Sequence, residues 1–433
     1  MDTDFHYYGT GAAAVNAGFE PEEAAWIANA AEFVDWFNSD YWSYWSLFVE
    51  GKSETYTNYP QLSCQSIDWK MIADYDSDIW NAFHFPPGNS AHRPVRGTEW
   101  ITQFQAAHLV RATGLGPSDA KKLCRPYSPF ALDMINDTVG KCTELRKLRG
   151  NSEALAKLVD DWLDGRTRIS VKDPWRLALT LLGIRMHILA DTWAHQDFTG
   201  GASAAINGAG TLNYIYAGGD NAPLQSTSWT GTLWVLGKDT DCAAAPNVPG
   251  DAACRGHGQV GHFPDYSWLT FIYPAAWLPE GGYLLRNNPS QYVPAWRWLS
   301  FVMAMANGRS FSSFDACAIP TEIEATIRTP HELDNTRLFA VPESESVWQQ
   351  TQLCQTFIDQ WRWNDDAGAF DDEARTKLGV KGGALPTTRF QSLTVVAESV
   401  LHYMELASAL HYQWCVAWAN KNQSYGWTPV KRT

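Results

Sequence analysis

The chain has 433 residues, a net charge of −14 at pH 7 and a pI of about 5.2. Hydrophobic residues make up 45% and charged residues 18%, which argues against a disordered chain. This excess of acidic residues argues against a protein that DNA or RNA wraps around, because an acidic surface repels phosphate backbones. No stretch of about 18 uncharged apolar residues occurs, so we expect no membrane span. The chain begins without the pattern of a signal peptide, so we expect a cytoplasmic protein.

Tryptophan and cysteine are used in informative ways. The 22 Trp residues either build a rigid core or line a pocket for an apolar or aromatic ligand, and we favour the core. The eight Cys residues contain no C-x-x-C pair, which argues against a zinc ribbon and favours buried thiols in a reducing compartment. Cys242 and Cys254 flank a Pro-, Gly- and Ala-rich loop, so a disulfide between them is the alternative.

Helices dominate the first half of the chain. A helix is expected to begin at Pro21, which two acidic residues follow, and to run to about Phe37. Residues 38–95 look irregular. Helical patterns then cover 98–113, 117–124, 129–147 and 152–164. The clearest helix begins at the N-cap and proline pair Asp173-Pro174 and runs to about Phe198.

The second half begins with the least regular segment. Residues 200–265 are rich in small and polar residues, with one possible β hairpin at 211–236, so we expect a loop-rich insertion or lid. Helices are expected at 292–306, 343–361, 370–378 and 387–420. The sequence therefore predicts a mainly α protein, a multi-helix bundle around a buried metal site. One domain spanning 1–433 is favoured over two.

Three polar residues on the 174–198 helix carry the strongest chemical signal. His187, Asp191 and His195 are four residues apart, and each is offset by about 40° from the last, so all three lie on one side of the helix. Their neighbours are apolar, which predicts burial. A buried carboxylate without a partner costs several kcal/mol, whereas a divalent cation bound by imidazoles and carboxylate removes that cost. The alternative is a hydrogen-bonded His–Asp–His network without metal.

Other candidate ligands are scattered along the chain. A glycine-rich loop contains two His and one Asp within nine residues, free to wrap an ion or to remain a flexible polar loop. His6 at the start of the chain, Asp35 at the end of the first helix and His84 in an aromatic segment are further candidates. For His6 the alternative is a frayed terminus, and for His84 it is a histidine buried in the core. The candidate metal ligands are His6, Asp35, His84, His187, Asp191, His195, His257, His262 and Asp265.

These nitrogen and oxygen donors, without thiolates, suit two or three Zn²⁺ ions, with Fe²⁺ or Mn²⁺ as alternatives. A competing set on the last helix is Glu398, His402 and Glu405. Di-iron proteins place carboxylate and His on bundle helices, but they use Glu-x-x-His twice, whereas this helix has Glu-x3-His once. We therefore expect His402 and Glu405 to be a surface pair or a pair supporting the site.

The chain resembles an uncharacterised microbial domain family whose members begin with a similar D-F-H-Y-Y motif. The resemblance covers most of the chain and implies no activity. It rests on five segments: Asp4-Phe5-His6-Tyr7-Tyr8, the helix ending in Asp35, Phe83-His84-Phe85, the His187 to His195 helix, and Gly256-His257-Gly258 to Pro264-Asp265.

The pattern is also similar, more remotely, to the zinc-dependent phospholipase C and single-strand nuclease superfamily, whose members are α-helical and hold three zinc ions. The resemblance implies that His187 and Asp191 match the superfamily's His-x3-Asp pair, with Asp191 as the bridging carboxylate and His195 as the following His. His6, Asp35 and His84 would stand for its early ligands. Its N-terminal Trp and later His-x3-Glu have no counterpart, and the loop with His257, His262 and Asp265 would replace the latter.

The expected function is a multi-metal hydrolase in which metal-activated water attacks an ester or phosphoester of a small molecule with an apolar or aromatic portion. Asp191 and His195 are the expected catalytic residues. A non-haem iron oxygenase, a Lewis-acid lyase or cyclase, and a non-enzymatic protein with a structural metal site are the alternatives. The sequence contains no phosphate-binding loop, G-x-S-x-G elbow or H-E-x-x-H motif.

Overall fold

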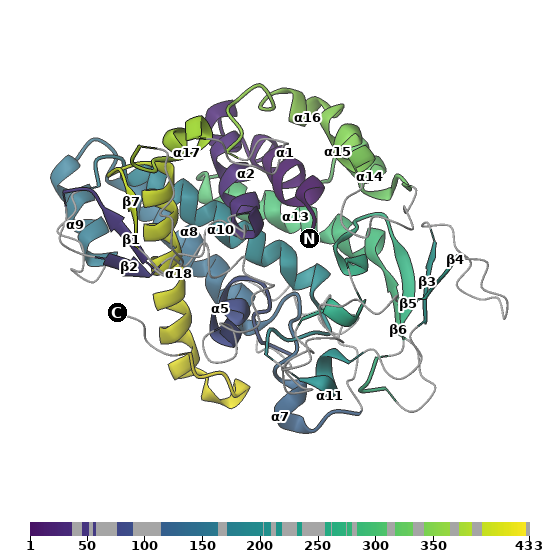
Figure 1. Cartoon of the computed structure of the whole chain (residues 1–433). Helices are drawn as coiled ribbons and strands as arrows, with labels where there is room; N and C mark the ends of the chain where they lie inside the picture. Colours follow the sequence, from purple (N-terminus) through teal and green to yellow (C-terminus); the bar gives the residue numbers. More distant parts are fainter. Residues whose placement is uncertain are drawn as a thin grey trace.

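The structure is a computed structural model of the chain. It describes residues 1–36, 46–51, 55–57, 76–89, 114–162, 171–201, 203–208, 214–218, 232–235, 256–260, 262–273, 275–278, 284–309, 317–331, 342–363, 372–382 and 392–429. These residues are mainly helical, as predicted (Figure 1). The expected helix at 98–113 and the Cys242–Cys254 pair lie outside the described residues.

One helix, α10 (Pro174–Ala194), lies at the centre of the molecule. Asp173 caps its first turn by accepting a hydrogen bond from the Arg176 amide, and Pro174 stands in that turn, as the sequence predicts. Every residue from Leu177 to Ala194 is buried. Four long helices pack around α10, namely α2 (Pro21–Trp36), α8 (Pro129–Lys147), α13 (Asn288–Ala306) and α18 (Val400–Lys421).

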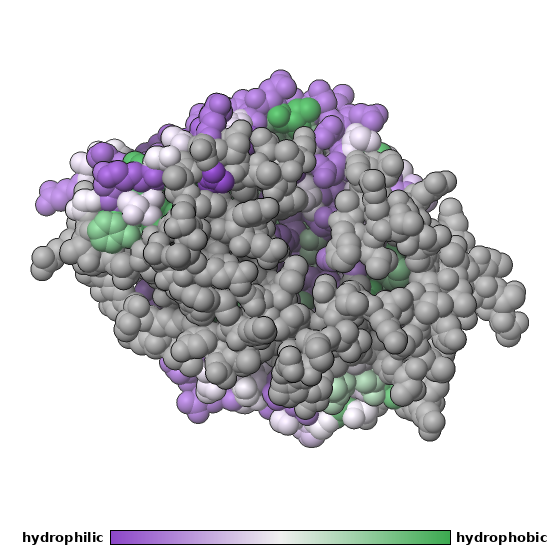
Figure 2. All heavy atoms as spheres, in the orientation of Figure 1, coloured by the Kyte–Doolittle hydropathy of each residue, from purple (hydrophilic) through white to green (hydrophobic). Residues whose placement is uncertain are grey.

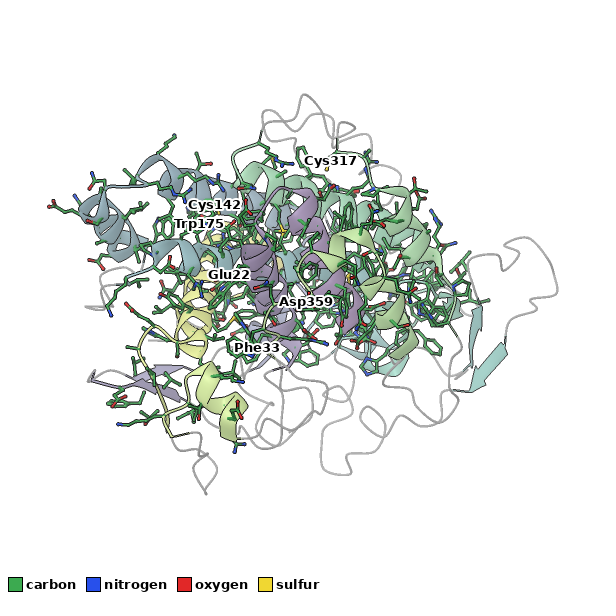
Figure 3. The ribbon with its side chains drawn as sticks, turned by 90° about the horizontal axis from the view of Figure 1, so that it is seen from above. Glu22, Phe33, Cys142, Trp175, Cys317 and Asp359 are labelled. Carbon is green, nitrogen blue, oxygen red and sulfur yellow. The ribbon has the colours of Figure 1, made fainter. Side chains whose placement is uncertain are left out.

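Small residues let α2 and α10 approach closely. A Cβ atom on Gly183 of α10 would lie 2.5 Å from the Ile27 carbonyl oxygen and 2.7 Å from the Ala30 Cβ. The first turns of the two helices also lie together, as the labelled Glu22 and Trp175 show (Figure 3), and Trp175 Nε1 donates a hydrogen bond to the Glu23 carboxylate. The close approach places the last turn of α2 beside the middle of α10.

The start of the chain is helical, although no helix was expected before Pro21. A π-helix, η1 (Asp4–Gly9), continues into α1 (Thr10–Asn16), and both pack against α2. The Phe5 ring lies edge-on to Tyr292, with ring centroids 4.9 Å apart. Trp296 Nε1 donates to the Gly9 carbonyl at 2.9 Å. These contacts bury η1 in the core.

Two small sheets lie on opposite sides of the helical body (Figure 1). In the first, β1 (Ser46–Val49) pairs antiparallel with β2 (Thr55–Thr57) and parallel with β7 (Ser392–Val395). The second is antiparallel, with the order β4 (Thr232–Val235), β3 (Tyr214–Gly218), β5 (Thr270–Tyr273) and β6 (Leu284–Asn287). The β3–β4 pair confirms the expected hairpin, which β5 and β6 extend.

Shorter elements complete the fold. They are α5 (Asp76–Phe83), α7 (Pro117–Ala120), α9 (Ser152–Trp162), α11 (Ala204–Asn207), η3 (Gly258–Val260), η4 (Phe263–Asp265), α14 (Thr321–Arg328), α15 (Pro342–Gln349), α16 (Gln352–Gln355), α17 (Asp372–Leu378) and η6 (Gln423–Tyr425).

Several predicted boundaries were wrong. The expected helix at 387–420 begins only at Val400, because its first part forms β7. The expected helix at 343–361 is broken into α15 and α16, because the Thr351 hydroxyl accepts from the Cys354 amide and starts a new turn. The 174–198 helix ends at Ala194.

Aromatic side chains are mainly core residues. Trp193, Trp296 and Trp348 are among the largest fully buried side chains. Cys124, Cys142, Cys317, Cys354 and Cys415 are buried and free, as expected of structural thiols. Few large apolar side chains are exposed among the described residues, and the upper rim in Figure 2 is mainly hydrophilic. Within the described part of the chain, no helix is both long and apolar enough to cross a membrane.

Candidate metal centre

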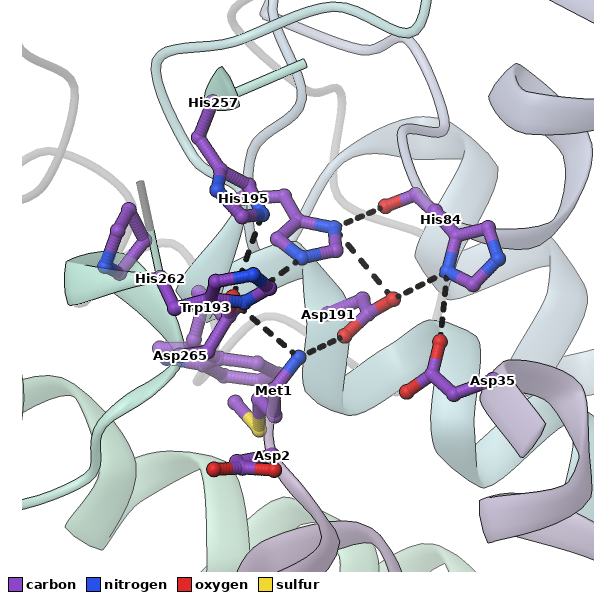
Figure 4. Close-up of polar contacts among 12 residues, drawn as sticks. Met1, Asp2, Asp35, His84, Asp191, Trp193, His195, His257, His262 and Asp265 are labelled. Atoms are coloured by element: carbon purple, nitrogen blue, oxygen red, sulfur yellow. Dashed lines mark hydrogen bonds and ion pairs between the residues drawn. The ribbon is translucent and has the colours of Figure 1, made fainter. Parts of the chain in front are cut away.

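The polar side of α10 faces a cluster of buried ionisable groups (Figure 4). His187 and Asp191 are fully buried, and His195, the residue that ends the helix, is 4% exposed. The four-residue spacing therefore directs these three side chains to one region, as predicted. Around them the structure brings together all nine candidate ligands: seven form two groups, and His6 and His262 each lie beside one of them.

The first group contains Asp35, His84, His187 and Asp191, and we call it the four-donor group. His84 Nδ1 and His187 Nε2 each lie 3.1 Å from Asp191 Oδ2, and they lie 3.2 Å from one another. Asp35 Oδ1 completes the group at 3.6 Å from His84 Nδ1 and 3.8 Å from His187 Nε2. The donors come from the end of α2, the residue after α5, and α10.

These separations match a tetrahedral zinc site. With metal–ligand bonds of about 2.0–2.1 Å, neighbouring ligand atoms of a tetrahedron lie about 3.3 Å apart. Five of the six separations among the donor atoms run from 3.1 to 3.8 Å. An ion bound here would have His84, His187 and Asp191 as ligands, with the half-exposed Asp35 carboxylate beside them.

His6 lies on the other side of the same carboxylates. Its Nε2 is 3.2 Å from Asp191 Oδ1 and 3.6 Å from Asp35 Oδ2, and its ring stacks on His187 with centroids 3.7 Å apart. Its Nδ1 is buried without a hydrogen-bond partner, whereas Nε2 faces the two carboxylates. A cation bound between Nε2 and these carboxylates would give all three groups a partner.

The second group contains His195, His257 and Asp265, and we call it the three-donor group. His195 Nε2 lies 3.4 Å from Asp265 Oδ1, and His257 Nε2 lies 3.5 Å from Asp265 Oδ2. His262 lies at the rim, 44% exposed, with Nδ1 3.2 Å from Asp265 Oδ2. Three protein donors leave room for a further ligand, the arrangement of catalytic rather than structural zinc sites.

One hydrogen bond sets the orientation of His195. Its Nδ1 lies 2.8 Å from the His84 carbonyl oxygen, which only accepts, so Nδ1 carries the proton. The other ring nitrogen, Nε2, then faces Asp265 Oδ1 at 3.4 Å, so this hydrogen bond orients the ring toward the three-donor group. The Phe85 ring also stacks on His195, with centroids 4.3 Å apart.

The amino group of Met1 takes part in the centre, which the sequence did not predict. Its nitrogen lies 2.9 Å from Asp191 Oδ1 and 3.3 Å from Asp265 Oδ1, so it sits between the two groups. A main-chain amine leaves no side-chain signal, and only the nearby D-F-H-Y-Y motif pointed to this end of the chain.

Electrostatics favour cations at both groups. Burial alone would raise the carboxyl pKa values, but His195, the amino terminus and His187 hold the pKa of Asp191 well below its usual range. His257 and the amino terminus act in the same way on the pKa of Asp265. Burial, the neighbouring His187 and the amino terminus lower the pKa of His6 to about 3. Ionised carboxylates beside a neutral imidazole are the protonation states that bind divalent metals.

Nearly the whole chain matches one protein family. A family model described as a family of unknown function (DUF6765) covers residues 1–417. The chain belongs to this family. The match includes every residue of both groups, because they lie between His6 and Asp265. Neither the curated proteins nor the solved structures contain a match.

The competing set on α18 does not join the centre. His402 and Glu405 are each 1% exposed, which contradicts the first of the two expected alternatives, a surface pair. The His402 Nδ1 atom accepts from the Glu398 amide at 2.8 Å, which ties it to the start of its own helix. Among the described residues, the three groups with metal-binding geometry all belong to the cluster around Asp191.

Proposed function

We propose that this chain is a multi-zinc hydrolase. The observation that carries the proposal is the presence of two neighbouring groups of buried His and Asp side chains, His84, His187 and Asp191 in one and His195, His257 and Asp265 in the other. When bound, the ions would lower the pKa of a coordinated water and polarise the bond to be cleaved. The residues themselves would hold the ions, and the His195 ring is oriented by its hydrogen bond to the His84 carbonyl.

We further propose a distant relationship to the zinc-dependent phospholipase C and single-strand nuclease superfamily. Supporting this, His187 and Asp191, the pair that the resemblance matches to the superfamily's His-x3-Asp, lie together with His84, and the loop residues His257 and Asp265 lie with His195.

The proposed substrate is a small ester or phosphoester with an apolar portion. The aromatic surroundings of the three-donor group support this choice, since Phe85 stacks on His195 and lies 6.0 Å from His257, and Phe198 lies 5.9 Å from His257. Five buried free cysteines are in keeping with a reducing, cytoplasmic location.

Elemental analysis of protein purified without chelators tests the proposal. The protein should carry no histidine tag, because the imidazoles of such a tag bind zinc themselves. Two or three zinc ions per chain are expected in the wild type. Asp191→Asn should lose at least one ion and should hydrolyse chromogenic ester and phosphodiester substrates at least about 100-fold more slowly.

Glu405→Gln is the matched control, since Glu405 is also a buried carboxylate on a core helix. This variant should keep both metal and activity. A wild-type protein that binds no zinc when zinc is added back would overturn the proposal. Stoichiometric iron with a visible absorption band would overturn the choice of hydrolysis and favour oxygen chemistry.

A further inference from the structure

A buried cluster of three charged residues lies directly behind the end of α10. Arg125, Asp197 and Arg286 are exposed by 1%, 2% and 4%. Arg125 Nη1 donates to Asp197 Oδ1, and Arg286 Nη1 lies 3.6 Å from Asp197 Oδ2. Desolvating three ionised groups is costly, so their presence indicates a role beyond filling the core. None of the three belongs to the metal-binding groups.

Arg286 binds the carboxyl end of α10. From the inner face of β6, its Nη2 donates to the carbonyl oxygens of Trp193 at 3.0 Å and Ala194 at 2.9 Å, and Nη1 donates to that of Gln196 at 2.9 Å. The last carbonyls of a helix lack partners within it, and a cation there also interacts favourably with the helix dipole. One guanidinium thus satisfies the carbonyls on both sides of His195.

Asp197 holds the turn that follows His195. Its φ of +82° lies in the left-handed region, which is strained for most residues other than glycine. Backbone hydrogen bonds join this turn to a neighbouring segment: the Asp197 amide donates to the Cys124 carbonyl at 3.2 Å, and the Cys124 amide donates to the Phe198 carbonyl at 2.8 Å. The ion pair with Arg125 reinforces the same connection.

The same turn also reaches the loop that carries the remaining donors. The Thr199 carbonyl accepts a hydrogen bond from the Gly256 amide at 3.0 Å, and His257 is the next residue. Gly256 has a φ of +52°, and a Cβ there would lie 2.5 Å from the Phe85 ring, so the loop must pass close to the core. The position of the turn therefore determines where both His195 and His257 lie.

We propose that Arg125, Asp197 and Arg286 form a turn clamp, a set of positioning residues for the three-donor group. The proposal deepens the proposed function and rests on it. Because Arg286 and Asp197 bind the end of α10 and the following turn, loosening the clamp displaces His195 and His257 but leaves Asp35, His84 and His187 in place. Outer partners of this kind typically change metal affinity by about 10–100-fold.

Zinc titration of the full-length, metal-freed protein against a chromophoric chelator tests the clamp. Arg286→Met and Asp197→Asn should weaken the more loosely bound zinc by about 10–100-fold and leave the tighter zinc unchanged. Arg286→Lys should restore part of the affinity, because a lysine still places one cation at the helix end. Asp197→Asn keeps a residue that tolerates positive φ, so it separates the lost charge from backbone strain.

Arg146→Met is the matched control. Arg146 donates through Nη1 to the carbonyl of Asn307, the residue that ends α13, at 2.7 Å, and so binds a helix end that carries no donor. This variant should lose stability and keep both zinc affinities. If Arg286→Met does not fold, Asp197→Asn and Arg286→Lys decide the matter. Wild-type affinity at both sites in these variants would overturn the clamp and leave the proposed function intact. A wild type that binds no zinc would overturn both.

Discussion

The two donor groups of this centre are built in different ways. The four-donor group takes Asp35, His84, His187 and Asp191 from helices or the residue directly after a helix, on elements that pack in the main core. The three-donor group takes His195 from a helix end and its other donors from the loop with η3 and η4. Rigid helices suit an ion that stays bound and supports the fold. A loop held by hydrogen bonds suits an ion with an open position, where ligands exchange.

Removing all metal should have the largest effect. Without cations, Asp35, Asp191 and Asp265 gather in one small region with only imidazoles and one amine as partners. An ion at 1,000 times its dissociation constant stabilises by about 4 kcal/mol. We therefore expect chelation to lower the thermal midpoint by about 10 °C or more, measured by calorimetry. An unchanged midpoint after proven metal removal would contradict a supporting role for the four-donor ion.

Single-ligand variants should separate the two groups. His84→Gln should lose the tighter ion and lower the free energy of unfolding by about 3 kcal/mol, because His84 is buried in the core. His257→Gln should lose the weaker ion and the hydrolytic activity but cost less than about 1 kcal/mol, since its side chain is 14% exposed. Urea unfolding and zinc analysis check both. Equal losses of stability would mean that the groups do not differ as their construction implies.

A change at the contact between α2 and α10 should alter the zinc affinity of the four-donor group and leave that of the three-donor group unchanged. Gly183→Ala places a Cβ 2.5 Å from the Ile27 carbonyl, so the helices must separate and Asp35 must move away from His187. We expect a loss of about 1–3 kcal/mol and a weaker tight site, with the other zinc unaffected. Gly140→Ala on α8 is the control, because nothing lies within 4 Å of its added methyl group. That variant should gain about 0.5–1 kcal/mol of stability.

An effect outside the donor groups concerns the pH dependence of stability and His411, which lies in the core behind α5. Burial and the nearby Arg185 lower the pKa of His411 to about 3, while its Nε2 donates to the Ala82 carbonyl. The neutral form is therefore favoured by folding: its contribution is present above the unfolded pKa of about 6.5 and is lost as the pH falls from there toward 3. His411→Gln should flatten the fall in stability by at most about 1.4 kcal/mol per pH unit. If the free energy of unfolding of the wild type and of His411→Gln falls in parallel below pH 6, this prediction is contradicted.

Local sequence signals, an N-cap residue followed by proline, correctly indicated where helices begin. The Asp173-Pro174 pair marks the start of α10, and the same kind of signal, Asn287 before Pro289, starts α13 four residues earlier than the apolar pattern indicated. The strand β7 was predicted to be part of the helix at 387–420, and its partner, β1, lies more than 300 residues away in the sequence. No local pattern reveals such a pairing.

The residues of the candidate centre could largely be chosen from the sequence, because His and Asp side chains on an apolar helix are costly to bury unless a cation or hydrogen bonds balance them. Periodicity along α10 was enough to predict that His187, Asp191 and His195 share one side. Only the tertiary structure decided how the candidate residues are distributed between the two donor groups. Asp35 reaches His187 because Gly183 lets two helices approach closely. The amino group of Met1 lies between the groups because η1 is packed into the core. It also decided the role of Arg286, since a helix end and a strand that meet only after folding leave no trace in spacing or composition.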